Sequence, residues 1–466
     1  MRPRLLLAAL LLFLLLGTPA RAAEDTYYIF QAKTALEEPA LSRAEPLHQA
    51  SGIYRTNELS LIEELDAAGL LLYWAPDAEV QLFDLAEDAQ ALLSEDWSRA
   101  MLGVGHAFDR GIYGSGVRVG MIDSGIRADF GELTGAAVIQ GVNYLAGADS
   151  EERGDTSDSV GHGTFVASVI ASDAVGIAPG AELVPLKCFD AKTSSVSCIV
   201  SAVYDAVDVY HCDVLNLSLG MASDNQALRQ AIAYAHESGV IIVAASGNLS
   251  GAASTGGNDK LYYPAAYDGV IGVGAVDRAK GIGSFSVQNE SVWVTAPGAA
   301  VSGLALEGTE YKSGSGTSYA APFVAAAAAL ALEADPDMTP ARFMDLLAAS
   351  SEDLGDEGYD KTYGNGLLNV GLLLATAQED SQSLILSAWG GSICVSAWYP
   401  DTGSAFQLLL ARYNSSGRFI EARFLTNGAG APLLNNQALP EDLTPFAIFV
   451  VEQGSYIPIT AARRYL

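Results

Sequence analysis

Between residues 117 and 245 the chain alternates short, almost wholly apolar runs with longer helical patterns. The apolar runs are Val117 to Ile122, Ala181 to Phe189, Val214 to Leu219 and Val240 to Ala245, and the helical patterns are Phe165 to Ala171, Ser195 to Tyr210 and Asn225 to His236. The apolar runs do not alternate with polar residues, which is typical of parallel strands buried on both faces by helices. The sequence therefore predicts an α/β fold with a doubly wound, mostly parallel sheet.

A serine stands at the predicted start of a long Ala-rich helix. Gly316 to Pro322 lead directly into the run Phe323 to Leu332, which places Ser318 at the helix N-terminus. The unpaired N–H groups and the positive end of the helix dipole at such a site suit an oxyanion that forms during acyl transfer. Ser and Thr are also ordinary helix caps, so Ser318 needs a base elsewhere in the chain to indicate catalysis.

Such a base and its partner precede the serine. Asp123 follows the first apolar run, and His162 stands between two glycines at the start of a helical pattern. A histidine can accept the serine proton, and an aspartate can hold the imidazole in the required tautomer. Asn248, after the last apolar run, could donate to the oxyanion. Taken singly, Asp123 could be a turn residue, His162 a core histidine and Asn248 a turn residue.

These segments together resemble the subtilisin-like serine peptidases. The matching motifs are Ile122-Asp123-Ser124-Gly125, Gly161-His162-Gly163-Thr164, Leu217-Ser218-Leu219-Gly220, Ala244 to Asn248, Gly316-Thr317-Ser318 with Ala321-Pro322, and Tyr363-Gly364-Asn365-Gly366. They occur in the family's order and cover about Trp97 to Ala377. The resemblance implies a catalytic triad of Asp123, His162 and Ser318 with Asn248 in the oxyanion hole. It also implies substrate-binding segments, which are Ser218, Leu219 and Gly220 and then Ala244, Ala245 and Ser246.

The ends of the chain predict export and additional domains. Residues 1–22 have a basic start, an apolar stretch Leu5 to Leu16 and a small-residue cleavage site, which is typical of a signal peptide. This apolar stretch is shorter than the about 20 residues that a membrane-spanning helix needs, so we do not expect it to be a permanent anchor. After removal of the signal peptide we expect no membrane span. The sequence thus predicts a protein secreted to the extracellular space of a bacterium.

Two further segments flank the predicted peptidase domain, residues 96–378. Residues 23–95 have a β-α-β pattern, with strands at Tyr27 to Ala32, Leu70 to Trp74 and Val80 to Phe83 and a helix at Leu59 to Ala67. They resemble the family's inhibitory propeptide, a generic N-terminal interaction domain being the alternative. We expect self-cleavage between Phe83 and Trp97. Residues 384–466 are rich in predicted strands and favour a small β-sandwich.

Charge and cysteine content limit partners and cofactors. With 25 Lys and Arg against 55 Asp and Glu, the net charge of −30 disfavours nucleic acid and anionic membrane surfaces as partners. The resemblance to the peptidase family implies protein or peptide substrates. The candidate disulfides are Cys188 with Cys198 and Cys212 with Cys394, although three pairings are possible and buried free thiols are the alternative. No metal motif is present. Residues 171–179 leave no room for a calcium-binding insertion that many relatives carry, so calcium stays possible without an identified site, and no cofactor is expected.

The resulting hypothesis is a secreted serine endopeptidase that works through an acyl-enzyme. The alternative is a catalytically idle protein of the same fold that binds partners through its C-terminal domain. The four matching catalytic positions favour the enzyme, because a binding protein has no need to keep all of them.

Overall fold

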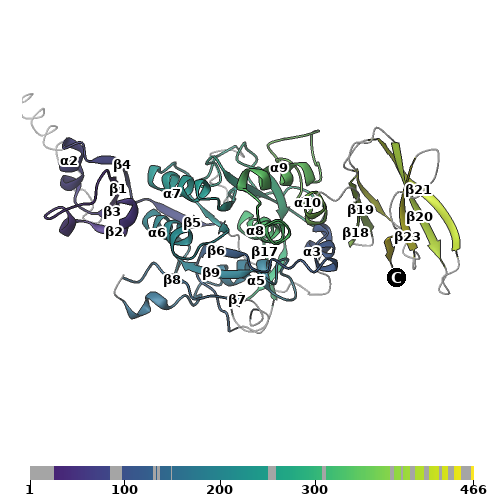
Figure 1. Ribbon diagram of the computed structural model, residues 1–466, viewed down its shortest axis with the longest axis horizontal. Helices are drawn as coiled ribbons and strands as arrows, with labels where there is room; N and C mark the ends of the chain where they lie inside the picture. Colours follow the sequence, from purple (N-terminus) through teal and green to yellow (C-terminus); the bar gives the residue numbers. More distant parts are fainter. Residues whose placement is uncertain are drawn as a thin grey trace, which may run out of the picture. The chain divides into compact units, whose positions relative to one another are not determined.

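The computed structural model describes residues 26–83, 97–129, 133, 137–147, 150–249, 259–306 and 311–377, and the backbone of seven strands between residues 383 and 465. The predicted signal peptide and the segments 84–96 and 378–382 lie outside the described residues. The chain divides into two compact units, Met1–Ala78 with Asn225–Ala227, and Glu79–Asp224 with Leu228–Leu466. Figure 1 labels the elements of both.

The first unit is a four-stranded antiparallel sheet with one α-helix. The strand order is β2-β3-β1-β4, where β1 is Tyr28–Ala32, β2 Glu45–His48, β3 Ile53–Thr56 and β4 Leu71–Pro76. The helix α2 (Leu59–Ala67) buries Leu61, Ile62 and Leu65 against this sheet. The prediction of β1, α2 and β4 is confirmed, but strands β2 and β3 were not predicted. The predicted strand at 80–83 does not join this sheet.

The second unit is built on an eight-stranded parallel sheet, as predicted. Its order is β15-β14-β13-β11-β6-β9-β7, with β8 also paired to β9. The strands are β6 Arg118–Asp123, β7 Ala137–Val138, β8 Val142–Asn143, β9 Glu182–Lys187, β11 Val214–Leu217, β13 Ile241–Ala245, β14 Val270–Val276 and β15 Val294–Pro297. Every residue of β11, β13, β14 and β15 is buried, which explains the absence of polar alternation in these runs.

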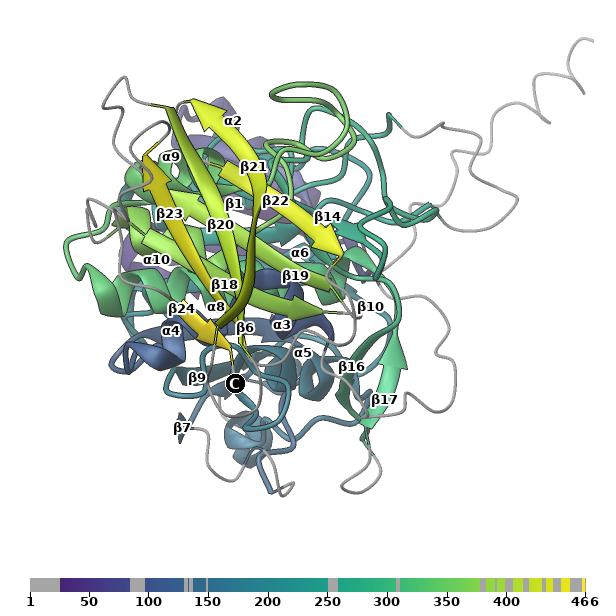
Figure 2. The same cartoon turned by 90° about the vertical axis from the view of Figure 1, so that its right-hand side faces the viewer.

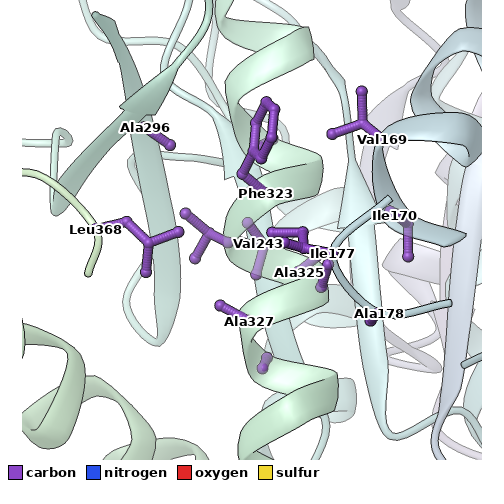
Figure 3. Packing of buried hydrophobic residues seen from close by; sticks show 14 of the residues in the cluster. Val169, Ile170, Ile177, Ala178, Val243, Ala296, Phe323, Ala325, Ala327 and Leu368 are labelled. Carbon is purple, nitrogen blue, oxygen red and sulfur yellow. The ribbon is translucent and has the colours of Figure 1, made fainter. Parts of the chain in front are cut away.

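A long helix, α8 (Thr317–Ala334), forms the centre of the core. It contacts β11, β13 and β14 of the sheet and, beside it, α5 (His162–Ala171). Figure 3 shows Phe323, Ala325 and Ala327 of α8 packed among residues of the sheet and of α5. By length and composition α8 could cross a membrane, but 83% of it is buried inside the protein. Its many alanines allow a close approach to the sheet, so α8 is a core helix.

The remaining helices complete the layers around the sheet. They are α3 Trp97–Leu102, α4 Gly105–Asp109, α6 Val196–Asp208, α7 Gln226–Glu237, α9 Pro340–Ser350 and α10 Val370–Ala377. Helix α6 packs on β6 and β9, and its buried Ile199 and Val203 lie outside the cluster that surrounds α8, which places α6 on the opposite face. The sheet is therefore covered on both faces.

The C-terminal strands form two antiparallel sheets, seen in Figure 2. One has the order β18-β19-β22 and the other β21-β20-β23-β24. The strands are β18 Ser383–Trp389, β19 Ser392–Trp398, β20 Ala405–Tyr413, β21 Phe419–Ala429, β22 Leu433–Ala438, β23 Phe446–Glu452 and β24 Arg463–Tyr465. The β-rich character agrees with the sequence, while the packing of these sheets as a sandwich stays a prediction.

Candidate active site

Asp123 and His162 meet at the carboxyl edge of the central sheet. Asp123 is the last residue of β6, and His162 is the first residue of α5. Nδ1 of His162 lies 2.8 Å from Oδ1 and 3.0 Å from Oδ2 of Asp123, and both side chains are buried. Because an ionised carboxylate only accepts, this contact places the imidazole proton on Nδ1 and leaves Nε2 as the acceptor.

A second buried carboxylate, which the sequence analysis missed, holds this pair in place. Asp158 accepts hydrogen bonds from the Ser124 hydroxyl at 2.9 Å and from the backbone N–H groups of Val160, Gly161 and Thr164, each at 2.9 Å. It also accepts from the Thr164 hydroxyl at 2.7 Å. Asp158 therefore ties the residue after Asp123 to the first turn of α5. An Asp four residues before the His, with Thr164 after it, was the available sequence signal.

Ser318 and Asn248 converge on one carbonyl oxygen, that of Phe83. The Ser318 N–H donates to this oxygen at 3.4 Å and the Asn248 side-chain amide at 2.8 Å, and the Ser318 hydroxyl also donates to it. The orientation of the Asn248 amide is fixed, because its Oδ1 accepts from the backbone N–H of Thr317 at 3.0 Å and from the Thr317 hydroxyl at 2.9 Å. Two N–H donors thus point at one oxygen beside a serine hydroxyl, the geometry of an oxyanion hole.

Because of a proline in α8, the backbone carbonyl of Ser318 is free to accept a hydrogen bond from Ser218. Pro322 lacks an N–H, so the carbonyl of Ser318, four residues earlier, loses its helical donor. The Ser218 hydroxyl donates to that carbonyl at 2.8 Å. Ser218 therefore has a structural partner in the first turn of α8 as well as a place in the predicted substrate-binding segment.

Phe83 directly follows a strand that lies between two others. Strand β5 (Glu79–Leu82) pairs antiparallel with β10 (Thr193–Ser195) on one side and with β12 (Leu219–Gly220) on the other. The N–H of Phe83 donates to the Ser218 carbonyl at 3.5 Å. The predicted residues Ser218, Leu219 and Gly220 therefore flank an extended piece of the chain itself.

The Phe83 ring occupies a closely fitting pocket. It meets the ring of Tyr262 edge to face, with centroids 5.0 Å apart and planes at 81°. A Cβ on Gly220 would lie 2.3 Å from the Phe83 ring, so the absence of a side chain at Gly220 makes room for it. Tyr262 was missed by the sequence analysis, because nothing in its local pattern distinguishes it from Tyr263.

The other predicted substrate-binding residues lie at the end of β13. Ala244 and Ala245 pair with Gly272 and Val273 of β14, and the Ser246 N–H donates to the Val273 carbonyl at 3.0 Å. All three are buried and lead directly to Asn248. Their observed contacts are with the sheet, and they position the turn that carries the Asn248 amide.

The cysteines with described side chains are unbridged. Cys188, Cys198 and Cys212 carry free thiols, and Sγ of Cys188 lies 3.5 Å from the Cys198 carbonyl oxygen. The side chain of Cys394 lies outside the described residues. Burial raises the pKa of the Cys188 thiol well above its usual value and that of Cys212 to about 12. The expected disulfides are thus not formed among the described cysteines.

The central part of the chain is similar in sequence to known proteins. The family model described as "Subtilase family" matches residues 114–366, more than half of the chain. The chain belongs to the subtilase family. It is 38% identical over 267 residues to "Subtilisin DY" of Bacillus licheniformis, which covers 56% of this subtilase and 92% of that protein. It is 29% identical over 365 residues to "Thermostable alkaline protease" of Halalkalibacterium halodurans, with 77% and 95% covered.

A third relative matches a smaller share of its own length. The subtilase is 33% identical over 279 residues to "Minor extracellular protease Epr" of Bacillus subtilis, covering 59% of this chain and 41% of that protein. Membership of the family confirms the expected doubly wound α/β fold and makes the subtilase a serine-type endopeptidase that acts on proteins and peptides.

Among the described residues, no three His, Cys, Asp or Glu side chains lie close enough together to hold a metal ion. The connection after α5 is short and closed by its own hydrogen bonds. The N–H of Gly176 donates to the Ser172 carbonyl at 2.9 Å, and the N–H of Val175 donates to the Ser172 hydroxyl at 3.2 Å.

Proposed function

We propose that the subtilase cleaves peptide bonds through an acyl-enzyme in which Ser318 is the nucleophile. His162 accepts the Ser318 proton at Nε2 as the hydroxyl attacks the carbonyl carbon, and Asp123 holds the imidazole and stabilises the imidazolium. The observation that carries this proposal is the Phe83 carbonyl, which two N–H donors and the Ser318 hydroxyl contact together.

The remaining steps follow from the same groups. Negative charge that develops on the carbonyl oxygen is stabilised by the Ser318 N–H and the Asn248 amide. His162 then gives its proton to the leaving amine, and the reverse sequence with water releases the acid and restores Ser318. Each proton transfer and the oxyanion stabilisation are assigned to groups of the chain, so we propose no cofactor for the chemistry.

The first substrate in this proposal is the chain itself, at the bond between Phe83 and Asp84. This bond is the first in the predicted window of residues 83 to 97. Strand β5 already lies antiparallel between β10 and β12, as an extended substrate would. After cleavage, residues up to Phe83 act as an intramolecular inhibitor, because the product strand keeps its hydrogen bonds in the cleft. The propeptide boundary is then placed after Phe83 rather than at residue 95.

The buried side chains of β5 describe the proposed substrate class. Val80, Leu82 and Phe83 are buried, whereas Glu79 and Gln81 are exposed. The alternation from Glu79 to Leu82 is that of an extended strand with one face buried, and Phe83 adds a ring buried against Tyr262 on the other side. We expect extended peptides with apolar residues at these positions and an aromatic residue before the cleaved bond.

We further propose that the subtilase is exported and acts outside the cell. The basic start and apolar stretch of residues 1–22 support this proposal. The relative from Bacillus subtilis is named an extracellular protease, which agrees with this proposal.

Two measurements test the proposed enzyme. A fluorophosphonate probe should label the mature wild type and not Ser318→Ala, while Ser238→Ala, at an exposed serine after α7, should label normally. Ser318→Ala should accumulate as a precursor, and the mature wild type should begin at Asp84. Absence of labelling after removal of residues up to Phe83 would favour the catalytically idle binding protein. A mature protein that reacts with the probe but begins at a residue other than Asp84 would contradict the proposed cleavage site and leave the proposed enzyme activity intact.

A further inference from the structure

The residue after the nucleophile, Tyr319, packs against the catalytic imidazole. Tyr319 is fully buried in the first turn of α8, and its ring centroid lies 5.4 Å from that of His162, with the planes tilted by 37°. On the same ring, Phe165 packs at a centroid distance of 4.1 Å. His162 therefore has Asp123 at Nδ1 and an aromatic ring beside its plane.

Two glycines on neighbouring strands leave room for the rings of Phe165 and Tyr319. Strands β16 (Val301–Leu304) and β17 (Tyr311–Gly314) pair antiparallel, with Gly303 opposite Lys312 and Gly314 opposite Val301. A Cβ on Gly303 would lie 2.5 Å from the Phe165 ring, and one on Gly314 would lie 2.8 Å from the Tyr319 ring.

These two glycines are needed for space and not for backbone conformation. Neither Gly303 nor Gly314 has a positive φ. A larger side chain would be allowed there by the backbone, yet it would displace an aromatic ring. The two aromatic residues and the two glycines are therefore complementary in shape, which fixes the position of the Tyr319 ring.

We infer that Tyr319 is a positioning residue that stabilises the imidazolium form of His162. An aromatic ring attracts a cation that lies over its face, within about 6 Å of the ring centroid. The centroids of the Tyr319 and His162 rings are 5.4 Å apart, within this distance, and their planes are tilted by 37° and not perpendicular, as they would be in an edge-on contact. This inference rests on the proposed function, in which His162 becomes positively charged while Ser318 attacks. The ring then favours the charged state of His162 in the transition state.

The other charged or titratable groups around the imidazole are known from the structure. Asp123 contacts Nδ1, and Asp158 lies at the start of α5. Lys312 on β17 lies with Nζ 5.8 Å from the centroid of the Phe165 ring. The Cys188 thiol lies near Asp123, and burial raises its pKa well above the usual value, so it stays neutral. A substitution at Tyr319 changes none of these charged or titratable groups.

The test compares Tyr319→Leu with Tyr319→Phe in the full chain, after maturation, by measuring kcat/KM against pH. Without the ring, Tyr319→Leu should lower the plateau of kcat/KM by about 2- to 30-fold, the range of a cation–π contact. Its acidic limb should move to lower pH by roughly 0.4 to 1.5 units, because the imidazolium of the free enzyme loses the same stabilisation. Tyr319→Phe keeps the ring and should retain both the plateau and the limb.

A matched control separates this role from simple loss of packing. Phe343→Leu removes a fully buried aromatic ring from α9, so it should lower the melting temperature without moving the acidic limb. If Tyr319→Leu lowers the plateau with an unmoved limb, or if Tyr319→Phe behaves like Tyr319→Leu, the inference is overturned. A wild type that neither reacts with the fluorophosphonate nor cleaves peptides would instead overturn the proposed function.

Discussion

Replacing Asp158 by Asn should weaken both the fold and the active site. Oδ1 of Asp158 accepts from the Ser124 hydroxyl and from the N–H groups of Val160 and Gly161, and Oδ2 accepts from the N–H and the hydroxyl of Thr164. An Asn side chain has one acceptor oxygen in place of two. Its NH₂ group must therefore face at least one of these donors.

The best arrangement of the amide in Asp158→Asn can be worked out from these contacts. With its oxygen at the position of Oδ1, the amide keeps the three bonds from Ser124, Val160 and Gly161 and turns its NH₂ toward Thr164. The Thr164 hydroxyl can rotate to accept, but the backbone N–H of Thr164 cannot. One buried N–H left unsatisfied costs about 1–3 kcal/mol, and each bond that loses its charged acceptor weakens by roughly 1 kcal/mol.

We expect a total loss of about 3 kcal/mol in the free energy of unfolding, because Asn is also less costly to bury than a carboxylate. At roughly 2–4 °C per kcal/mol for a unit of this size, the melting temperature should fall by about 6–12 °C. It is best measured by calorimetry in the Ser318→Ala background, where the protein cannot digest itself. In the active background, kcat/KM should fall roughly 10- to 100-fold, since Asp158 positions both Asp123 and His162.

Asp155→Asn is the matched control for this prediction. Asp155 lies in the same loop, is exposed, and accepts hydrogen bonds from Ser157, one of them from its backbone N–H at 3.0 Å. Its substitution should change the free energy of unfolding by less than about 0.5 kcal/mol. Equal melting temperatures for Asp158→Asn and Asp155→Asn would refute the reasoning.

Three further predictions follow from the site and from the cysteines. Asn248→Ala should lower kcat by about 10²–10³ with little change in KM, a magnitude carried over from a subtilisin, and an unchanged kcat in a steady-state assay would remove Asn248 from the oxyanion hole. Phe83→Lys should slow the appearance of the mature form on a gel, whereas Gln81→Lys, at an exposed position of the same strand, should mature normally; equal rates would argue against the pocket. Burial raises the pKa of Cys212 to about 12 and that of Cys188 well above its usual value, so both thiols should be unreactive at pH 8 in the folded enzyme. Mass spectrometry should show that iodoacetamide modifies neither thiol in the folded enzyme and both after denaturation. Modification of the folded enzyme would contradict the burial of these thiols. A raised folded-state pKa also means that the contribution of Cys212 to stability is complete below the pKa of the unfolded thiol and is lost as the pH rises toward about 12.

The proposed catalytic residues could be placed on the fold from the sequence, because each of them stands at the end of an element with a strong pattern. Asp123 ends the buried strand β6, His162 begins α5, and Ser318 lies in the first turn of α8. The carboxyl ends of parallel strands lie at one edge of a sheet, where the following helices begin, so Asp123 and His162 could be expected at the same edge, and they are in contact there.

The occupant of the cleft could not be predicted from the sequence. The sequence predicted a strand at Val80 to Phe83, but the partners of the observed strand β5, which are β10 and β12, are more than 100 residues away along the chain. Pairing over such a distance depends on tertiary structure and not on local propensity. Strand β2 was missed for a different reason, since it is a short edge strand that contains Pro46, and such strands carry a weak pattern.

The contacts of Tyr262 and Tyr319 with the site could not be predicted from the sequence. Each lies within an apolar or aromatic stretch that is typical of core packing. What distinguishes them is the neighbour across the fold, which is the Phe83 ring for Tyr262 and the imidazole for Tyr319.

The pairing of β5 with β10 and β12 has a consequence for how this enzyme can evolve. Because the active site and its first proposed substrate are encoded in one chain, the proposed maturation requires each copy to cleave the bond after its own Phe83 before it acts on any other peptide. A change at Gly220 or Tyr262 that remodels the pocket therefore arrests its own maturation unless residue 83 changes with it. A change in substrate specificity therefore requires matching changes in two distant stretches of one gene. A mutant library that varies the pocket residues should vary residues 80–83 in the same clones.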